Sequence, residues 1–361
     1  MKMRKIVCSF MISVVCFMTA ISGVSATSYD TSKINAAYSK VVEYYKNNNN
    51  LNNADKILAV ESLGLEAESN QFDTSSANLS STSLSKKIVT EVLLGVDPTK
   101  DKETLESQID ENGNVEGSWG ASSDVWTLYA LYVTSSEKTN LIANKLNDEL
   151  AASSVCGYEW GGTYYADYDT TGWVIEGLAV VNKEKYGTTI NKAIDYIKNN
   201  TTMTTTGWVT ADNVDTQSQV LEGMFAYDTN ALLNDSYTVH PVDCLLNTQL
   251  SDGSFPSGYN AEYTTAEVAK TLGTYKNGSV FEKAKKAYDK MMNPEQPDNT
   301  KPAQPTDTKK DSQSTNKVET TNQKTTSVKT GDETNVVIFV SLSMVSGGLF
   351  LVLRKEYERV H

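Results

Sequence analysis

Histidine and cysteine are scarce in this chain, which has two histidines and four cysteines among 361 residues. Cys8 and Cys16 lie within residues 1–26, a segment that we expect to be removed as a signal peptide. The mature chain then keeps Cys156 and Cys244. These two residues are consistent either with one disulfide outside the cell or with two separate buried thiols. A framework of several disulfides is excluded.

Positive charge is also in short supply. The chain has 32 Lys and Arg residues against 45 Asp and Glu residues, so its formal net charge is −13. Proteins that bind nucleic acid or anionic lipid need basic patches. We therefore expect no nucleic-acid partner. The acidity is consistent with a soluble surface domain, or with a domain that meets cationic ligands or metal.

The N-terminal segment predicts export. Lys2, Arg4 and Lys5 precede an apolar stretch over residues 6–24, and residues 24–26 (Val-Ser-Ala) form a small-x-small cleavage pattern. Polar residues follow at once. We expect cleavage after residue 26, with an uncleaved N-terminal anchor as the alternative.

The C-terminal part predicts attachment to the membrane. Residues 336–353 form an uncharged apolar run, close to the ~20 residues that span a bilayer. The basic tail 354–361 follows, so the tail should be cytoplasmic and the main domain 27–292 outside. Between them, residues 293–335 are rich in Pro, Thr, Ser and Lys and have no aromatic residue, which predicts a disordered stalk.

A short motif precedes the apolar run. Lys329, Thr330 and Gly331, followed by the apolar run and basic tail, resemble the cell-wall sorting signals of Gram-positive bacteria. The resemblance implies cleavage between Thr330 and Gly331 and linkage of Thr330 to peptidoglycan. The usual Leu-Pro is replaced by Ser327-Val328, so a simple membrane anchor is the alternative. Both readings place the protein on the extracellular face, attached to the membrane or the cell wall.

The main domain contains an internal repeat. Four alignable segments start 45, 46 and 47 residues apart, at Asp124, Asp169, Asp215 and Glu262. A preceding aromatic residue is common to all four: Trp119, Trp160, Trp208 and Phe255. Such a period is typical of helical repeats. We expect each acid to cap the helix that it begins.

Apolar periodicity predicts two sets of helices. We expect six inner helices, which begin near Ala54, Leu84, Asp124, Asp169, Asp215 and Glu262. We expect outer helices near residues 34–45, 102–109, 139–151, 189–199, 241–250 and 280–291. Between Gly64 and Leu84 the pattern falls short of a full outer helix, so the number of hairpins is left open at this place.

This repeat resembles that of the terpenoid cyclase and protein prenyltransferase superfamily. Residues 249–255 match the Gln-x3-Gly-x-aromatic motif that recurs there. The resemblance covers residues 32–292. It implies an all-α domain, an α/α toroid of about six helical hairpins.

The catalytic motifs of that superfamily and its structural relatives are incomplete. The cyclase Asp-x-Asp-Asp motif is matched by Asp167-Tyr-Asp169-Thr170, which lacks the last acid. His240, Asp243 and Cys244 offer the residue types of the prenyltransferase zinc site, but they lie within five residues instead of in separate repeats. Residues 156–159 depart from the Cys-Gly-Glu-Gln segment of thioester domains. We expect no catalytic residues and no metal or cofactor; zinc and a corrinoid, the ligand of the toroidal vitamin B12 carriers, are both unsupported.

Two functions remain. The first is a non-catalytic surface module that binds a small molecule, a glycan or a protein partner. The second is a surface enzyme that acts on a polyprenyl, terpenoid or carbohydrate substrate, because an aromatic and acidic loop over residues 158–169 suits sugars. The candidate ligand-binding residues combine that loop with the inner helices: Trp126, Tyr164, Asp167, Asp169, Trp173, Asp215 and Glu262.

Overall fold

The computed structural model describes residues 28–68, 79–204, 207–208 and 213–294. The chain divides into two units, Met1–Asp298 and Asn299–His361, and all described residues belong to the first. The predicted signal peptide, most of the stalk, the sorting motif and the 336–353 span lie outside the described residues. Within the described ranges, no helix has the length and apolar character that a bilayer span requires.

The described part of the chain is mostly helical with two short strands, which agrees with the all-α prediction. Its helices are α1 (Thr31–Asn47), α2 (Ala54–Ser62), α3 (Ser81–Leu93), α4 (Thr99–Ser107), α5 (Ala121–Val133), α6 (Thr139–Ser153), α7 (Tyr168–Asn200), α8 (Val214–Asn234), α9 (Pro241–Leu246), α10 (Ala261–Asn277) and α11 (Val280–Met292). The two short strands are β1 (Gly157–Trp160) and β2 (Thr163–Ala166).

Two of these helices contain a break. Asn182 in α7 and Asp228 in α8 have non-helical backbone angles. Each side chain accepts a hydrogen bond from the backbone N–H three residues later, at 2.9 Å in both cases, as an N-cap does. α7 and α8 are therefore each two helices in sequence. The second half of α7 contains the outer helix that was predicted over residues 189–199.

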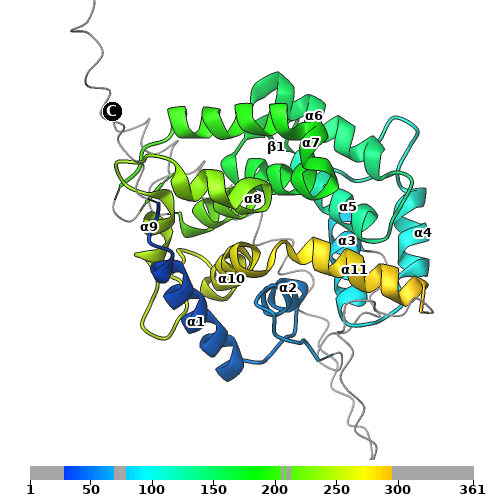
Figure 1. Cartoon of the computed structure of the whole chain (residues 1–361). Coiled ribbons are helices and arrows are strands. Elements are labelled where there is room, and N and C mark those ends of the chain that lie inside the picture. The colour runs from blue at the N-terminus through cyan, green and yellow to red at the C-terminus, as the bar shows by residue number, and fades with distance from the viewer. Residues whose placement is uncertain (1–27, 69–78, 205–206, 209–212, 295–361) are drawn as a thin grey trace, which may run out of the picture. The chain divides into compact units, whose positions relative to one another are not determined.

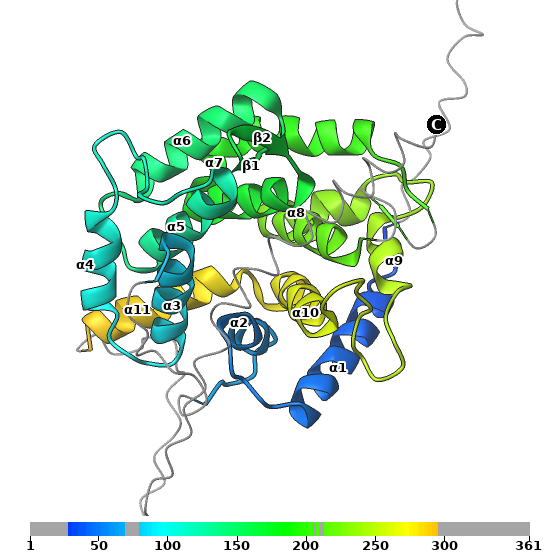
Figure 2. The same cartoon turned by 180° about the vertical axis from the view of Figure 1, so that it is seen from behind.

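Six helices contact one another in a closed circuit. α2 contacts α3, α3 contacts α5, α5 contacts α7, α7 contacts α8, α8 contacts α10, and α10 contacts α2 (Figures 1 and 2). We call α2, α3, α5, the first halves of α7 and α8, and α10 the inner helices. They begin within a few residues of the six helices that the apolar periodicity and the repeat together predict.

Glycines allow the inner helices to approach closely. A Cβ atom on Gly172 of α7 would lie 2.5 Å from the backbone of Gln219 in α8. On the other helix, a Cβ atom on Gly223 would lie 2.4 Å from the carbonyl oxygen of Gly172. Both glycines lie within the repeated segments. The absence of a side chain at these two glycines therefore allows α7 and α8 to lie close together.

The predicted caps are out of place by two residues in α7, α8 and α10 and by four residues in α5. The N-cap residues are Gly120 for α5, Asp167 for α7, Asn213 for α8 and Asn260 for α10. Asp167, Asn213 and Asn260 accept hydrogen bonds from a backbone N–H three residues on. The repeated acids Asp124, Asp169, Asp215 and Glu262 instead lie in the first turn. There their charge favours the helix N-terminus without capping it.

Helix α11 does not occupy the predicted outer position. It packs against α2, α3, α5 and α10, and so extends from α10 to the opposite part of the circuit (Figure 1). Phe281 is buried and its ring stacks on that of Tyr129 of α5, with centroids 3.6 Å apart. The apolar stripe that predicts this helix is present, but a stripe does not specify which surface it packs on.

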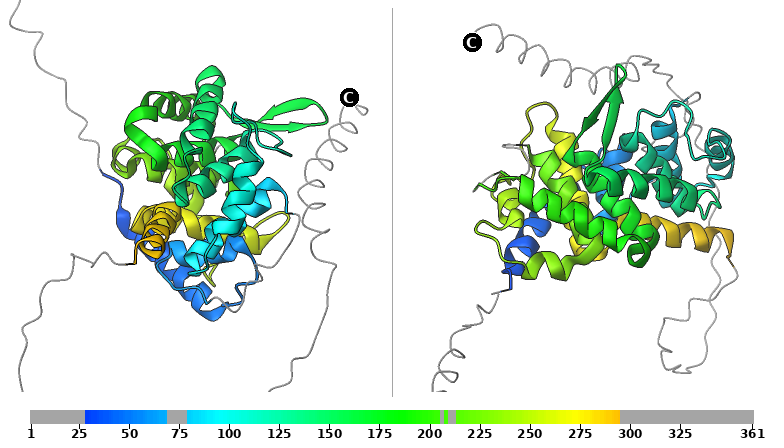
Figure 3. Two further views of the ribbon diagram at one scale, coloured as in Figure 1. Left: turned by 90° about the vertical axis from the view of Figure 1, so that its right-hand side faces the viewer. Right: turned by 90° about the horizontal axis from the view of Figure 1, so that it is seen from above.

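The aromatic loop before α7 forms a hairpin instead of irregular structure. β1 and β2 pair antiparallel, with Tyr158 opposite Tyr165 and Trp160 opposite Thr163. The turn is Gly161-Gly162, and both glycines have positive φ, as a two-residue type I′ turn requires. The hairpin projects from the helical body (Figure 3).

Candidate functional site

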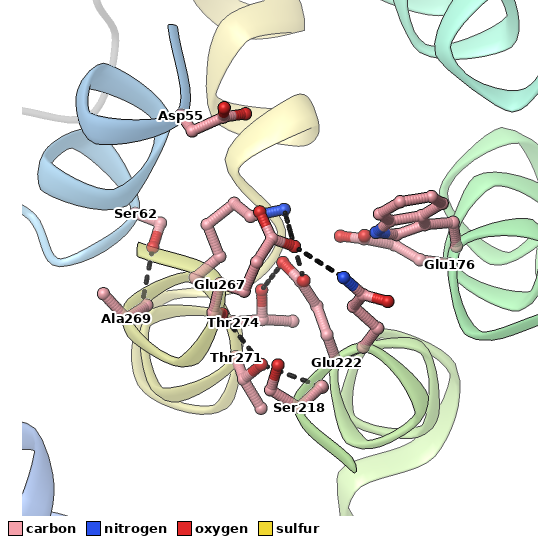
Figure 4. Close-up of polar contacts among 12 residues, drawn as sticks. Asp55, Ser62, Glu176, Ser218, Glu222, Glu267, Ala269, Thr271 and Thr274 are labelled. Atoms are coloured by element: carbon pink, nitrogen blue, oxygen red, sulfur yellow. Dashed lines mark hydrogen bonds and ion pairs between the residues drawn. The ribbon is translucent and has the colours of Figure 1, made fainter. Parts of the chain in front are cut away.

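The inner faces of three adjacent helices carry a set of polar residues in matching positions. The residues lie at positions i, i+4 and i+7 of each helix, a spacing that places them on one helix face. We call this set the polar column: Asp169, Trp173 and Glu176 of α7, Asp215, Gln219 and Glu222 of α8, and Tyr263, Glu267 and Lys270 of α10. Figure 4 shows Glu222, Glu267 and Glu176 converging from the three helices.

In the middle of the column, Lys270 forms ion pairs with two glutamates. Its ammonium lies 3.0 Å from Glu267 Oε2 and 3.6 Å from Glu222 Oε2, and all three side chains are at most 1% exposed. Gln219 Nε2 donates to Glu267 Oε2 at 3.3 Å. Burial lowers the pKa of Lys270, but the carboxylates of Glu222 and Glu267 outweigh burial and raise it above its usual value. Lys270 is therefore charged at neutral pH.

One end of the column is closed by α11. Ser279 Oγ donates to Glu176 Oε1 at 2.7 Å, and Tyr129 Oη donates to Glu176 Oε2 at 3.2 Å. Burial raises the pKa of Glu176, and burial together with the charge of Glu176 raises that of Glu222 well above its usual range. Glu222 is therefore harder to ionise than an exposed glutamate.

The other end of the column lies at the N-termini of the inner helices. Burial, followed by the charge of Asp167, raises the pKa of Asp169 to about 7. Burial raises the pKa of Asp215 to about 6, although the hydroxyls of Thr264 and Tyr259 lower it. Asp169 is only half-buried and Tyr259 is 59% exposed. This end therefore borders solvent.

Aromatic rings from α5 and α7 line the column. Trp126 lies edge-on to Trp173, with ring centroids 6.0 Å apart. Lys270 lies 5.6 Å and Lys86 lies 4.3 Å from the ring centre of Trp126, within the range of cation–π attraction. Lys86 also pairs with Asp55 at 2.8 Å. The column therefore has both carboxylates and indole rings along its length.

Several buried polar atoms of the column lack a hydrogen-bond partner within the described residues. Glu222 Oε2 is one of them, but it lies 3.6 Å from the Lys270 ammonium. The other four are Asp215 Oδ1, Gln219 Oε1, Glu267 Oε1 and Trp173 Nε1. Buried polar groups are nearly always satisfied by protein, water or ligand, because an unpaired one costs about 1–3 kcal/mol. Four such atoms on facing helices indicate that water or a ligand completes this interior.

The sequence-predicted site residues divide into two groups. Trp126, Asp169, Trp173 and Asp215 lie in or beside the column. Tyr164, Asp167 and Glu262 do not: Tyr164 is 45% exposed and donates to Glu149 at 2.8 Å, and Asp167 caps α7. The Glu262 side chain is 67% exposed and pairs with Lys56 at 2.8 Å.

The residues of the unsupported zinc site have separate structural roles. His240 caps α9 by accepting the Val242 N–H, Asp243 accepts from Tyr29 Oη at 2.6 Å, and the Cys244 thiol donates to the Thr204 carbonyl. No three His, Cys, Asp or Glu residues of the described ranges are placed to hold a metal ion. Cys156 and Cys244 are free and buried, so the two-thiol alternative is the correct one.

Sequence reasoning missed Gln219, Glu267 and Lys270 as site residues. Their signal was present, because polar residues at i, i+4 and i+7 interrupt faces that would otherwise be apolar. Each could also be read as an ordinary solvated position on a surface helix. Only the packing of α10 beside α8 shows that these side chains are buried together.

Comparison with known proteins yields no match: no protein-family model, curated protein or solved structure is detectably similar to this chain.

Proposed function

We propose that this chain displays a non-catalytic α/α toroid outside the cell, and that the toroid binds a small polar ligand in its interior. The toroid is supported by the closed circuit of inner helices together with the sequence repeat. The binding role is carried by one observation: Asp215 Oδ1, Gln219 Oε1, Glu267 Oε1 and Trp173 Nε1 are buried along the polar column and have no partner among the described residues.

A natural ligand would form hydrogen bonds with these atoms. Ligand pockets generally present a few convergent polar groups of this kind, which orient the ligand. The indole faces of Trp126 and Trp173 supply apolar contact beside them. Because α11 and its Ser279 close one end, the ligand enters between Asp169 and Tyr259. Glycans and protein partners remain candidates for the exposed hairpin, which carries Trp160.

The test is a thermal-shift panel on the purified full chain, with corrinoids, glycans and prenyl phosphates as well as simple polar compounds. A ligand of the folded state raises Tm by mass action. The shift should be lost in Trp173→Phe and Gln219→Leu, which alter the column, and kept in Trp160→Ala, which alters the hairpin. A shift that follows Trp160 instead would refute an interior site.

Surface display is the second part of the proposal. It rests on the residues 1–26 signal, the 336–353 span and the Lys329-Thr330-Gly331 motif. Cell fractionation tests it: muramidase should release the protein if Thr330 is joined to peptidoglycan, and only detergent should release it if the span is the anchor. A Thr330→Ala variant should abolish muramidase release in the first case. Recovery from the cytosol would refute display.

A second candidate function is a surface enzyme acting on a polyprenyl, terpenoid or carbohydrate substrate. It is favoured by Asp169, whose pKa of about 7 suits a general acid at neutral pH. Asp169→Asn would then reduce turnover by orders of magnitude while ligand binding persists. Under the non-catalytic proposal, bound ligand is recovered unchanged from wild type.

A further inference from the structure

We infer that the ligand of the polar column is a linear aliphatic diamine or polyamine. This inference rests on the proposed interior site and assigns the chemistry of its occupant. The charge of the column, the kind of atom that is left unpaired and the distribution of the carboxyl groups support it.

The column has more acids than bases. Asp169, Glu176, Asp215, Glu222 and Glu267 face it, and Lys270 is the one lysine among its nine residues. The nearby Lys86 is already paired with Asp55. Without a further cation, several carboxyls must bind protons, since a buried unpaired carboxylate is costly. A cationic ligand would neutralise them instead.

The unpaired atoms are mainly acceptors. Asp215 Oδ1, Gln219 Oε1 and Glu267 Oε1 each need a donor, while Trp173 Nε1 is the one donor among the four. An ammonium group offers three N–H donors and no acceptor. A neutral sugar or an anion would supply fewer donors or add further acceptors. The amine therefore fits the deficit best.

The acids are spread along the column and do not converge on a point. Positions i and i+7 of a helix are about 10 Å apart along its axis, at 1.5 Å per residue. Asp169 and Glu176 have this separation, as do Asp215 and Glu222. The described residues offer no cluster of three metal-ligating side chains. Charges spaced along an extended chain match this arrangement, whereas a single metal ion does not.

The apolar walls suit the methylene segments of such a ligand. Trp126 and Trp173 lie beside the carboxylates, and Lys270 and Lys86 already lie over the Trp126 ring. An alkyl ammonium gains cation–π attraction on an indole face in the same way. One ammonium of the ligand would lie near Asp215 and Asp169, and the other would lie deeper, near Gln219 and Glu267.

Isothermal titration calorimetry of the full chain at pH 7 and 0.15 M NaCl tests the inference. The probes are spermidine and 1,4-diaminobutane, with butylamine, 1,4-butanediol and MgCl2 as comparisons. We expect the diamine and spermidine to bind at one site per chain, at least tenfold more tightly than butylamine. We also expect protons to be released on binding, visible as a dependence of the heat on buffer ionisation, because a bound cation lowers the pKa values of the carboxyls around it.

Two variants localise the binding. Asp215→Asn keeps the shape of the side chain and removes an unpaired charge, and Glu267→Gln removes a charge deeper in the column. Each should weaken spermidine binding at least tenfold. Asp195→Asn, on the exposed outer half of α7, is the matched control and should leave affinity unchanged. Because Glu267 also pairs with Lys270, Asp215→Asn carries the conclusion if the other variant fails to fold.

The remaining outcomes are distinct. Binding of MgCl2 or butylamine as tight as that of spermidine, or equal weakening by Asp195→Asn, would show surface attraction only and would overturn the inference. Binding of a neutral or anionic compound that depends on Trp173, with no binding of amines, would overturn the amine and leave the interior site standing. If no compound of the panel binds the wild-type chain, and neither Asp215→Asn nor Glu267→Gln changes this, the amine inference and the interior site are both overturned.

Discussion

Replacement of Asp169 by Asn should stabilise the protein at alkaline pH and lose that effect in acid. Asp169 has a pKa of about 7 in the folded chain, against about 3.9 in an unfolded one. The folded state therefore binds the proton more tightly than the unfolded state. Stability contributed by this group is present below about pH 4 and is lost as the pH rises to about 7.

The size of the effect follows from the shift. Three pKa units correspond to about 4 kcal/mol at most, at 1.36 kcal/mol per unit. Partial exposure of Asp169 reduces this, and loss of a negative charge at the helix N-terminus costs a further ~0.3–1 kcal/mol. We expect Asp169→Asn to raise the free energy of unfolding by about 1–2 kcal/mol at pH 8, and to give no gain at pH 4.5.

Urea denaturation followed by far-UV circular dichroism at the two pH values measures the difference. Asp195→Asn is the control, since it removes an exposed acid from the same helix without entering the column. Equal effects of Asp169→Asn at pH 4.5 and pH 8, or destabilisation at pH 8, would refute the reasoning that burial raises this pKa.

Three further substitutions test the packing. Gly172→Ala places a Cβ atom 2.5 Å from the Gln219 backbone and should cost at least ~2 kcal/mol in thermal unfolding, whereas Gly258→Ala, with open space around it, should be close to neutral. Lys270→Met leaves Glu267 and Glu222 buried without their cation and should cost about 3–5 kcal/mol at pH 8. The cost should be smaller at pH 5, because burial raises the pKa of Glu222 and lets this group bind a proton more readily. Phe281→Ala removes a buried ring that stacks on Tyr129 and should cost about 3–5 kcal/mol, measured by urea denaturation; a cost below ~1 kcal/mol would mean that α11 is not docked as described.

The sequence predicted the helices well because their signals are local. Apolar periodicity and the 46-residue repeat located every inner helix to within a few residues, from Ala54 to Glu262. Cap positions were wrong in α7, α8 and α10 because two polar residues stand two positions apart near each of these helix starts. Asn213 and Asp215 both suit such a place, and only backbone geometry shows which one caps.

The site was only partly predictable. Trp126, Trp173, Asp169 and Asp215 were found because they stand in the repeated segments, but their partners on α10 were missed. Lys270 looks like a surface lysine in sequence, and its burial depends on α8 packing beside α10. The hairpin was missed although Gly161-Gly162 between β-forming residues is a recognisable type I′ turn.

The location of α11 could not be read from the sequence at all. Its stripe of buried residues, which includes Val280, Phe281 and Ala284, predicts a helix with one apolar face. Nothing in that stripe distinguishes an outer position from a position across α3 and α5. Such long-range placement depends on the shape of the surface that receives the helix, here the ring of Tyr129 and the carboxylate of Glu176.

The five tryptophans of the chain allow the interior ligand site to be tested directly. Each gives one indole N–H signal in a ¹⁵N-correlation NMR spectrum, and Trp→Phe variants assign them. On titration with a compound that raises Tm, spermidine first, we expect the Trp173 signal to move, because its buried Nε1 gains a partner or a new neighbour. The exposed Trp119 and Trp160 should stay fixed. Movement of Trp119 or Trp160 with Trp173 unchanged would place the ligand on the hairpin and contradict an interior site.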